Sequence, residues 1–479
     1  MRELVQVHGI DDLPTVAEVD PYWLGATSSA FGRAGEYGRR DSYVARTANR
    51  VDERLSEALV GDRLIVVVGP SKAGKTRTLF EAIHADDPDA RVVWPTPDGV
   101  VELAAHPRLT DTEDTLVVWL DDLHVYLTST VLLTPAVLAR LSARRGRTVV
   151  VATLRSEMRA RLRGGGGELR QENRMLLEQA VTIDLVSTSE DPNERAAATS
   201  TYPEQGGDGY GLAEVLAGAP ELLARYDDAR VADPPLYAVI ATAVDWARIG
   251  RNDPIPEPVL IDLALGQLRS AHPHLDATTH GMRAATAAAR TPPAGAGRAA
   301  ALLTTYLNAD TRGYKAFDYL VAADDGQDHR SLRPIPDNYW HNATRECDPA
   351  TLTRVGFAAY TRSNEAIAHT FFRKAADAGS VTAVSMLGAL LAQRGDWAEA
   401  EPWLRKAAEA QDATAAFNLG ALFTRRGDWA AAEPWLRKAA DAGDAIAASN
   451  LGAVLAQRGD WAAAEPWLRK AANAGDAIA

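Results

Sequence analysis

The sequence has a single cysteine, Cys347, so no disulfide can form within the chain. It has no apolar stretch of the roughly 20 residues that a membrane-spanning helix needs, and no apolar core of signal-peptide length follows Met1. Positive charge is in deficit, because 51 Lys and Arg face 64 Asp and Glu, and the net charge is −13. These shortages predict a cytoplasmic protein that binds neither nucleic acid nor a membrane surface.

The first half of the chain alternates short β-branched runs with helical stretches. Strands that are apolar along their whole length are typical of a parallel sheet covered by helices on both faces. We expect an α/β core with strands over 64–68, 91–94, 116–120, 149–152 and 181–185, and helices over 47–60 and 76–83. No strand pattern follows residue 188, and the Ala-, Pro- and Gly-rich stretch 286–300 is expected to be a loop or a poorly ordered insertion.

The segment Gly69–Thr76 fits the phosphate-binding pattern G-x-x-x-x-G-K-[ST]. It follows an expected strand and opens an expected helix, so its N–H groups can surround phosphate oxygens at the positive end of that helix. Lys75 is expected to contact the β- and γ-phosphates, Thr76 to bind Mg²⁺, and Lys72 to be solvated. The predicted phosphate-binding residues are Gly69, Pro70, Ser71, Lys72, Ala73, Gly74, Lys75 and Thr76.

Three charged side chains follow the next two apolar strands. Asp121 directly follows the strand 116–120 and is a predicted Mg²⁺ ligand. Asp122 is predicted to orient or deprotonate an attacking water, with a helix cap or surface carboxylate as the alternative. Arg155 is predicted to sense the γ-phosphate, with a surface salt bridge as the alternative. No N-K-x-D guanine signature follows, which favours ATP over GTP.

The C-terminal region repeats with a step of 32 residues, as its tryptophans Trp397, Trp429 and Trp461 show. Each unit has a Leu-Gly pair, then a Gly that should end one helix and an Asp that should cap the next. The tryptophans are expected to be buried wedges, and a divergent earlier copy surrounds Gly356. From about residue 350 the chain resembles tetratricopeptide (TPR) and SEL-like repeats, although the usual TPR step is about 34 residues.

Stacked helical repeats form one curved surface, which predicts that this region binds a protein or peptide. The repeats show no basic stripe and no exposed aromatic ladder, so nucleic-acid binding is not expected. The alternative is that the array is a purely structural arm. Phe417 and Arg425 are the expected anchors of an inner wall made of Ser385, Gln393, Phe417, Arg425, Ser449 and Gln457.

In this order the features resemble the STAND class of signalling ATPases, which includes NB-ARC and NACHT proteins, and the whole chain is similar to actinobacterial NTPase–TPR proteins. Tyr43-Val44-Ala45-Arg46 resembles the segment that packs on adenine in that class, and Gly218-Ala219-Pro220 resembles its Gly-x-Pro lid motif. The resemblance implies that Tyr43, Val44, Arg46 and Pro220 contact ATP or ADP. It also implies an ADP-contacting histidine, for which His272, His274 and His280 are candidates.

The resemblance implies a multidomain chain, in which a P-loop NTPase core is followed by a helical lid, a winged-helix-like relay and an α-α superhelix. The expected segments are 1–46 with the adenine-side motif, 47–190 for the core, 191–250 for the lid, 251–347 for the relay and 348–479 for the repeats. The expected hinge is formed by Gly206, Gly207, Gly209 and Gly211.

The implied function is an ATP-dependent switch in which slow hydrolysis and ligand binding by the repeats control opening and assembly into a homo-oligomer. No effector domain is visible, which slightly favours an effector acting in trans. An AAA+-type ATPase that remodels a protein client, and a repeat scaffold with a structural nucleotide, are the alternatives.

Overall fold

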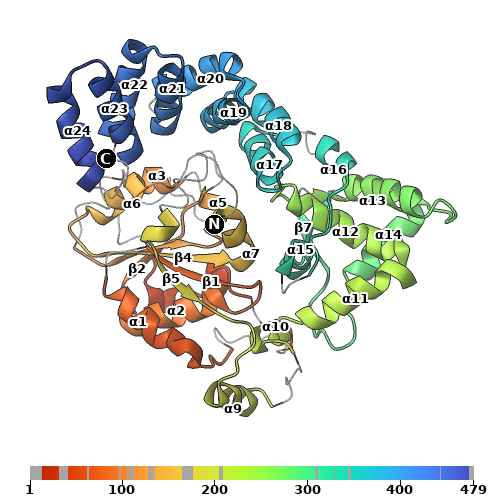
Figure 1. The fold of residues 1–479 in the computed structure, drawn as a ribbon. Helices are drawn as coiled ribbons and strands as arrows, with labels where there is room; N and C mark the ends of the chain where they lie inside the picture. Colours follow the sequence, from red (N-terminus) through yellow and green to blue (C-terminus); the bar gives the residue numbers. More distant parts are fainter. Residues whose placement is uncertain are drawn as a thin grey trace. The chain divides into compact units, whose positions relative to one another are not determined.

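The structure of the protein, a computed structural model, describes residues 13–27, 29–31, 41–61, 64–96, 99–104, 106, 113–127, 133, 135–163, 176–203, 209–307, 311–327, 330–342, 347–410, 412–442 and 444–473. The chain forms two compact units, one made of residues 1–165 and 172–343 and the other of 344–479 with 166–171. Both described sheets belong to the first unit (Figure 1). The predicted hinge glycines Gly206 and Gly207 lie outside the described residues.

The core of the first unit is a five-stranded sheet with the strand order β2-β3-β4-β1-β5. All of its neighbouring strands are parallel, which confirms the predicted parallel sheet. The last predicted residue of the fourth strand was Ala152, but this strand continues to Arg155. The strands are β1 (Ile65–Gly69), β2 (Arg91–Val93), β3 (Leu116–Leu120), β4 (Thr148–Arg155) and β5 (Val181–Asp184).

Alternate side chains of β1 enter two different apolar clusters, one on each face of the sheet. Ile65 and Val67 pack with Leu55 and Phe80 from the helices of one face, whereas Val66 and Val68 belong to the cluster of the other face. Burial on both faces explains why the strand is apolar throughout. The helices are α1 (Val51–Leu59) and α2 (Lys75–Asp86) on the first face, and α3 (Gly99–Ala104), α6 (Pro135–Ser142) and α7 (Ser156–Arg163) on the second (Figure 1).

A second, antiparallel sheet follows the parallel one and overturns the expectation that no strand follows residue 188. Its order is β6-β8-β7. The short β6 and the mixed polarity of β7 and β8 hid it, because only part of each strand is buried. In sequence the elements are α9 (Pro192–Thr201), α10 (Leu212–Leu216), α11 (Ala219–Ala232), α12 (Pro234–Arg248), β6 (Ile255–Pro256), α13 (Glu257–Ala271), α14 (Thr279–Ala289), β7 (Leu302–Tyr306), β8 (Arg312–Ala316) and α15 (Asp318–Asp324). Helix α14 therefore includes the start of the stretch 286–300, which we expected to be a loop.

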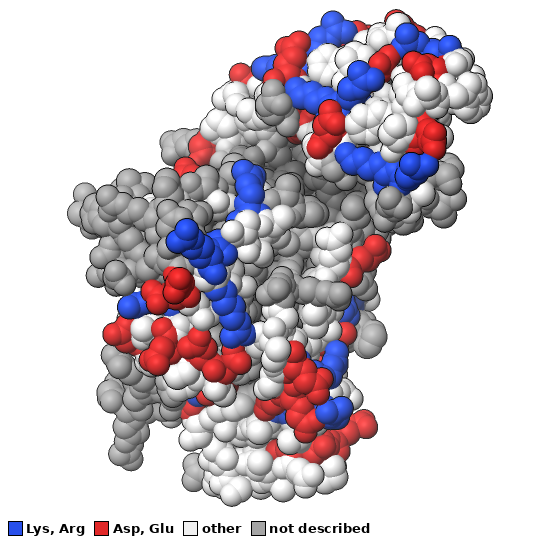
Figure 2. Space-filling model, turned by 90° about the vertical axis from the view of Figure 1, so that its left-hand side faces the viewer, with Lys and Arg blue, Asp and Glu red and all other residues white. Residues whose placement is uncertain are grey.

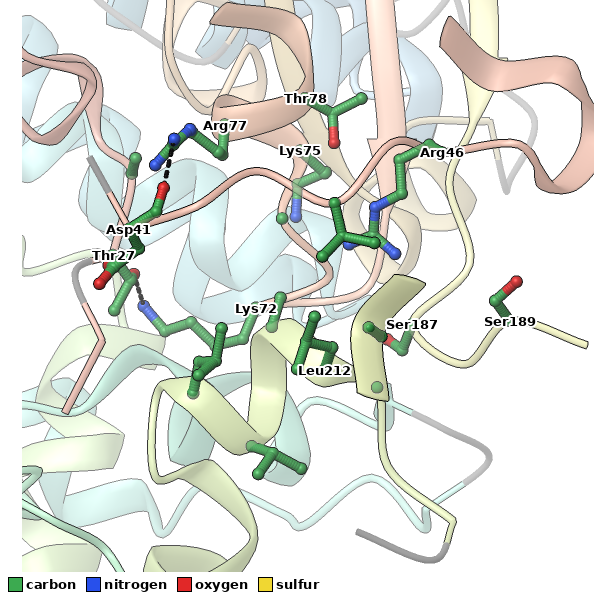
Figure 3. Close-up of a pocket in the computed structure, with 18 of the residues that line it drawn as sticks. Thr27, Asp41, Arg46, Lys72, Lys75, Arg77, Thr78, Ser187, Ser189 and Leu212 are labelled. Carbon is green, nitrogen blue, oxygen red and sulfur yellow. Dashed lines mark hydrogen bonds between the residues drawn. The ribbon is translucent and has the colours of Figure 1, made fainter. Parts of the chain in front are cut away.

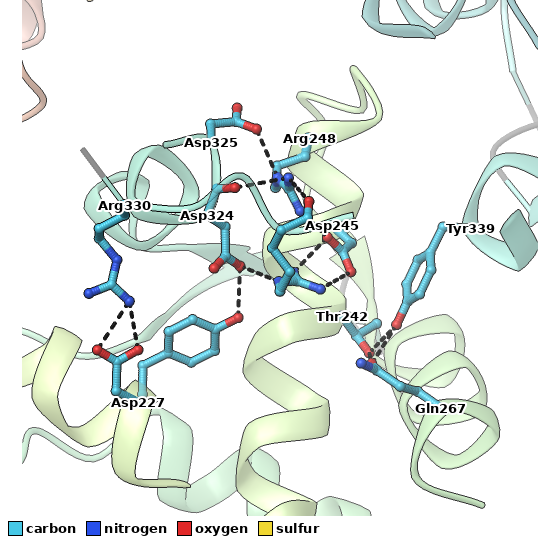
Figure 4. Close-up of polar contacts among 11 residues, drawn as sticks. Asp227, Thr242, Asp245, Arg248, Gln267, Asp324, Asp325, Arg330 and Tyr339 are labelled. Carbon is cyan, nitrogen blue, oxygen red and sulfur yellow. Dashed lines mark hydrogen bonds and ion pairs between the residues drawn. The ribbon is translucent and has the colours of Figure 1, made fainter. Parts of the chain in front are cut away.

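A buried cluster of charges joins α12 to the end of α15 and the residues that follow it (Figure 4). Arg248 donates to Asp245 at 2.8 Å and to Asp325 at 2.9 Å, and Arg333 donates to Asp245 and Asp324, both at 2.7 Å. Burial raises the pKa of Asp245, and the two arginines oppose that rise. Removing one partner of such a buried pair costs about 3–5 kcal/mol, so the cluster fixes the chain after α15 against α12.

The second unit consists of helix pairs, as the 32-residue step predicts. The pairs are α17 (Pro349–Thr361) with α18 (Glu365–Asp377), α19 (Val381–Arg394) with α20 (Trp397–Glu409), α21 (Ala413–Arg425) with α22 (Trp429–Asp441), and α23 (Ala445–Gln457) with α24 (Trp461–Asn473). Gly395, Gly427 and Gly459 follow the first helix of their pairs with positive φ. Asp428 and Asp460 cap the second helices, whereas Asp396 makes no capping hydrogen bond.

Neighbouring repeats are joined by a bridge of one glutamate and two arginines. Glu401 accepts from Arg405 of its own helix at 2.7 Å and from Arg426 of the next pair at 2.6 Å. Glu433 repeats this arrangement with Arg437 and Arg458. Figure 2 shows such acidic and basic side chains interleaved at its top, over the repeats.

The tryptophans of the repeats are not buried as expected. Trp403 and Trp435 are half-buried, and the Nζ of a lysine three residues later in the same helix lies over each ring. Trp461 is 68% exposed. The tight contact inside each pair is made by a glycine of its first helix, which is the glycine of the Leu-Gly pair in the last three pairs. A Cβ on Gly420 would lie 2.6 Å from Leu436, and a Cβ on Gly356 would lie 2.6 Å from Phe372.

Gly420→Ala should lower the free energy of unfolding by about 1–2 kcal/mol, because the overpacking outweighs the gain in helix propensity. Gly266 in α13 is the matched control, because nothing lies within 4 Å of a Cβ built there. Gly266→Ala should raise the free energy of unfolding by up to about 1 kcal/mol. Chemical denaturation of both variants tests this, and equal stabilisation by the two substitutions would contradict it.

Candidate functional site

A cavity of about 850 Å³ lies where the C-terminal ends of β1, β3 and β4 meet α10 and the segment before α1. Figure 3 draws part of this cavity, with Arg46, Lys72 and Lys75 labelled, and most of the predicted site residues line it. These are Tyr43, Val44, Arg46, Ser71, Lys72, Gly74, Lys75, Thr76, Asp121, Asp122 and Arg155. The predicted residues Gly69, Pro70, Ala73 and Pro220 are not among its lining residues.

The Gly69–Thr76 loop connects β1 to α2 and holds Lys75 at the helix N-terminus. Gly74 has φ +91°, which favours glycine, and a Cβ on Gly69 would lie 2.5 Å from the carbonyl oxygen of Leu185. Lys75 is 8% exposed, and its Nζ donates to the carbonyl oxygen of Pro70 at 2.7 Å. Burial lowers the pKa of Lys75, although Asp122 opposes this effect. A cation at a helix N-terminus forms an anion-binding position.

Asp121 is bonded to hydroxyl groups from two neighbouring segments. Thr153 Oγ1 donates to Asp121 Oδ1 at 2.7 Å, and Thr76 Oγ1 donates to the same atom at 3.3 Å. Burial and the charge of Asp122 raise the pKa of Asp121 to about 6. The described residues contain no group of three or more His, Cys, Asp and Glu that could hold a metal. The Thr76 and Asp121 oxygens suit Mg²⁺, which takes its other ligands from phosphate and water.

Asp122 lies beside Arg155 at the end of the sheet. Its side chain is 42% exposed, and Oδ1 lies 3.7 Å from Arg155 Nε and 3.9 Å from His124 Nδ1. Burial would raise the pKa of Asp122, but Arg155, His124, Lys75 and Lys72 together hold it below its ordinary value. Asp122 can therefore accept a hydrogen bond as a carboxylate near neutral pH.

Arg155 is only 16% exposed, so the ion pair that it forms with Asp122 is more buried than the surface salt bridge considered for it. Its Nη1 lies 3.7 Å from Glu157 Oε1, and neither that carboxylate nor Arg155 Nε has a hydrogen-bond partner among the described residues. Burial raises the pKa of Glu157, which Arg155 opposes. Glu157 was missed in the sequence, where its position two residues after Arg155 was the only signal.

Arg46 connects the Gly69–Thr76 loop to α9. Its guanidinium donates to Glu194 Oε1 and to the carbonyl oxygen of Ala73, both at 2.9 Å. Asp52 accepts from the backbone N–H of Arg46 and from the hydroxyl of Tyr43, both at 2.8 Å. Glu194 and Asp52 were not predicted, because both lie outside the Gly69–Thr76 pattern and contact the Tyr43–Arg46 segment.

Lys72 is not solvated as we expected, because its side chain is 11% exposed. Its Nζ lies 2.7 Å from Asp318 Oδ1 and donates to Asp318 Oδ2 at 2.8 Å. It also donates to Thr27 Oγ1 at 2.8 Å (Figure 3). The same Nζ lies 5.0 Å from the ring centre of Phe317. One residue earlier, the backbone N–H of Ser71 donates to Gln327 Oε1 at 3.0 Å.

The segment around Gly25 covers the carboxylate of Asp121. Gly25 has φ +105°, and a Cβ there would lie 2.0 Å from Asp121 Oδ2, so only glycine fits without movement. Gly25, Thr27 and Ser29 line the cavity. The sequence indicated only a loop here, because the contact joins residues about a hundred positions apart.

Pro220 and the candidate histidines do not reach the cavity. Pro220 lies in the first turn of α11. A Cβ on the preceding Gly218 would lie 2.6 Å from the carbonyl oxygen of Ala296, so the start of this helix packs against the segment around Ala296. Residues of α10, including Leu212 and Ala213, take the predicted place in the cavity wall. His272, His274 and His280 are not among the lining residues.

The similarity of this chain to a known protein family lies in the helix pairs of the second unit. Residues 381–406, 413–438 and 445–470 match the tetratricopeptide repeat family, so the second unit contains tetratricopeptide repeats. No curated protein matches the chain. No helix among the described residues has the length and apolar character to cross a bilayer.

Several solved structures are similar to part of the chain. "MamA 41-end from Desulfovibrio magneticus RS-1" is 23% identical over 28% of this chain and 81% of that chain, with a TM-score of 0.25. "Crystal structure of YrrB: a TPR protein with an unusual peptide-binding site" is 23% identical over 29% of this chain and 76% of that chain, with a TM-score of 0.26. "Crystal structure of MamA" is 18% identical over 28% and 84%, with a TM-score of 0.26.

Proposed function

We propose that the first unit is a P-loop ATPase of the STAND class and that ATP or ADP, with Mg²⁺, controls its conformation. The observation that carries this proposal is the meeting of Thr76 with Asp121, 45 positions later, beside the buried Lys75. A glycine turn without function would not require a hydroxyl, a carboxylate and a lysine to converge at one helix N-terminus. AAA+-type remodelling and a structural nucleotide remain the alternatives.

Each residue has a role that follows from its place in the cavity. Lys75 would neutralise the β- and γ-phosphates, and Thr76 and Asp121 would hold Mg²⁺, which neutralises developing charge during phosphoryl transfer. Asp122 would orient the attacking water and accept its proton. Arg155, which is partly buried beside Asp122, would contact the terminal phosphate.

The region after the parallel sheet supports a relay between nucleotide and partner. From Pro234 to Ala316 the order is helix, strand, helix, helix, strand, strand, which is the order of a winged helix. We infer that the winged-helix-like relay spans these residues rather than 251–347. Slow hydrolysis would then set the open and closed states and the assembly of a homo-oligomer, with an effector acting in trans.

Lys75→Ala should abolish stabilisation by MgATP. Wild-type protein at a hundredfold excess of ATP over the dissociation constant gains about 2.7 kcal/mol, because ATP binds the folded state alone. Thermal unfolding with and without MgATP measures this, and the unit of repeats should still fold in the variant. An undiminished shift in Lys75→Ala would place the nucleotide elsewhere. Fast steady-state turnover without a partner would favour the remodelling alternative over the switch.

We propose that the tetratricopeptide repeats bind a protein segment. The expected inner wall needs correction, because Ser385, Phe417 and Ser449 are buried and cannot form an accessible surface. Arg425 remains exposed, with its guanidinium 4.9 Å from the ring centre of Trp397 in the preceding pair. A cation on an aromatic ring presents a rigid anchor for an acidic segment.

Arg425→Glu should remove partners that a pull-down with the full chain retains, because it reverses the charge of this anchor. Arg469→Glu is the control, since Arg469 is 70% exposed and pairs with Glu465 of its own helix. Phe417→Ala is unsuitable, because emptying a buried aromatic site costs about 3–5 kcal/mol. If both charge reversals leave the same partners bound, Arg425 is not an anchor.

A further inference from the structure

Residues 317–327 hold the Gly69–Thr76 loop at two adjacent positions. Asp318 receives the ammonium of Lys72 on both carboxylate oxygens, at 2.7 and 2.8 Å. Gln327 accepts the backbone N–H of Ser71 at 3.0 Å and is 4% exposed. The cations and N–H groups of this loop would bind phosphate. One of the cations, Lys72, and one of the N–H groups, that of Ser71, are therefore already paired with acceptors of the protein.

The segment that makes these contacts is anchored at its other side. Asp324 and Asp325 lie between Asp318 and Gln327, and both belong to the buried cluster with Arg248 and Arg333 (Figure 4). The cluster prevents this segment from moving together with the Gly69–Thr76 loop. Movement of the loop away from the segment must therefore break the contacts of Asp318 or Gln327.

The pair also lines the same cavity as the residues assigned to the terminal phosphate. Lys72 and Asp318 both line the cavity, in which Asp122 and Arg155 also lie. The pKa of Asp122, which Arg155 lowers most, is lowered by Lys72 too. The Asp318 carboxylate in turn is one of the charges that act on Arg155. Both members of the pair thus interact with groups assigned to the terminal phosphate.

We propose that Lys72 and Asp318 discriminate between nucleoside triphosphates and diphosphates, an inference that rests on the proposed nucleotide site. The terminal phosphate of a triphosphate competes with Asp318 for Lys72 and is repelled by the Asp318 carboxylate. A diphosphate lacks that group and leaves the pair intact. The described arrangement therefore favours the diphosphate, and triphosphate binding breaks the ion pair while the hydrogen bond of Gln327 to Ser71 remains.

Calorimetric titration of the full chain with ADP and with a nonhydrolysable ATP analogue, each with Mg²⁺, tests this inference. Asp318→Asn should raise the preference for triphosphate over diphosphate about threefold to tenfold, a range set by the partial exposure of Asp318. Lys72→Met should lower that preference, since it leaves the carboxylate unpaired. Asp227→Asn is the control, because Asp227 forms a similar half-exposed pair with Arg330 elsewhere in the unit.

The outcomes separate this inference from the proposed function. If Asp318→Asn keeps the wild-type preference while Lys75→Ala abolishes binding of both nucleotides, the nucleotide site stands and the discrimination is wrong. If Lys75→Ala binds both nucleotides as the wild type does, the proposed function itself fails. A preference that rises in Asp318→Asn, falls in Lys72→Met and is unchanged in Asp227→Asn supports the inference.

Discussion

Asp122→Asn should lower the rate of ATP hydrolysis about a hundredfold or more, which is the range that general acid–base catalysis contributes. The reason is that the amide cannot accept a proton from the attacking water, whereas the carboxylate, held ionised by Arg155 and the neighbouring cations, can. Phosphate release over time, at saturating MgATP, measures the effect.

Binding of MgATP by the same variant is the internal control. Asn has nearly the shape of Asp, and Asp122 is not the predicted Mg²⁺ ligand, so thermal stabilisation by MgATP should persist. Wild-type turnover in Asp122→Asn would reject its role. Glu157, the other carboxylate beside Arg155, would then be tested next as Glu157→Gln.

Mg²⁺-dependent nucleotide binding should weaken about tenfold for each pH unit below 6, because protons compete with Mg²⁺ for Asp121. Burial and Asp122 raise the pKa of this carboxyl to about 6 in the folded protein. Above that pH Asp121 is ionised and can bind the cation, and below it the carboxyl is protonated. Affinity for MgATP measured between about pH 5 and 8 tests this prediction.

The folding equilibrium without nucleotide should respond with the opposite sign. A carboxyl whose folded pKa is raised binds its proton more tightly in the folded state, so its contribution to stability falls as pH rises from its ordinary pKa towards 6. Asp121→Asn should remove both dependences. If the affinity of the wild type for MgATP does not change across pH 6, Asp121 is not the Mg²⁺ ligand.

Much of the parallel sheet could be predicted because its strands are buried on both faces and are therefore apolar throughout. The strand 116–120 has the bounds that were predicted, whereas β7 was missed because its exposed Leu303 and Tyr306 break any simple alternation. The 32-residue step predicted the helix pairs, since identical contacts recur at identical spacing. It could not predict exposure, as Trp461 illustrates.

The lining of the candidate site was predictable where one segment contains the pattern and unpredictable where distant segments meet. Lys75 and Asp121 follow strands, and Arg155 ends one, at the same edge of the sheet, so their convergence follows from topology. Gly25 and Asp318 reach the cavity from segments that precede and follow the core. Only tertiary folding brings them there, and their local sequences contain no phosphate-binding pattern.

The interfaces between repeats have a consequence for how such a chain can change over generations. The glycine contacts of Gly388, Gly420 and Gly452 are made with leucines at the same spacing, and Glu401 and Glu433 form equivalent bridges to the next pair. A 32-residue unit can therefore be duplicated or lost by unequal recombination, and the new junction reproduces contacts that already exist. The length of the array can change in single genetic steps while the first unit is left unchanged.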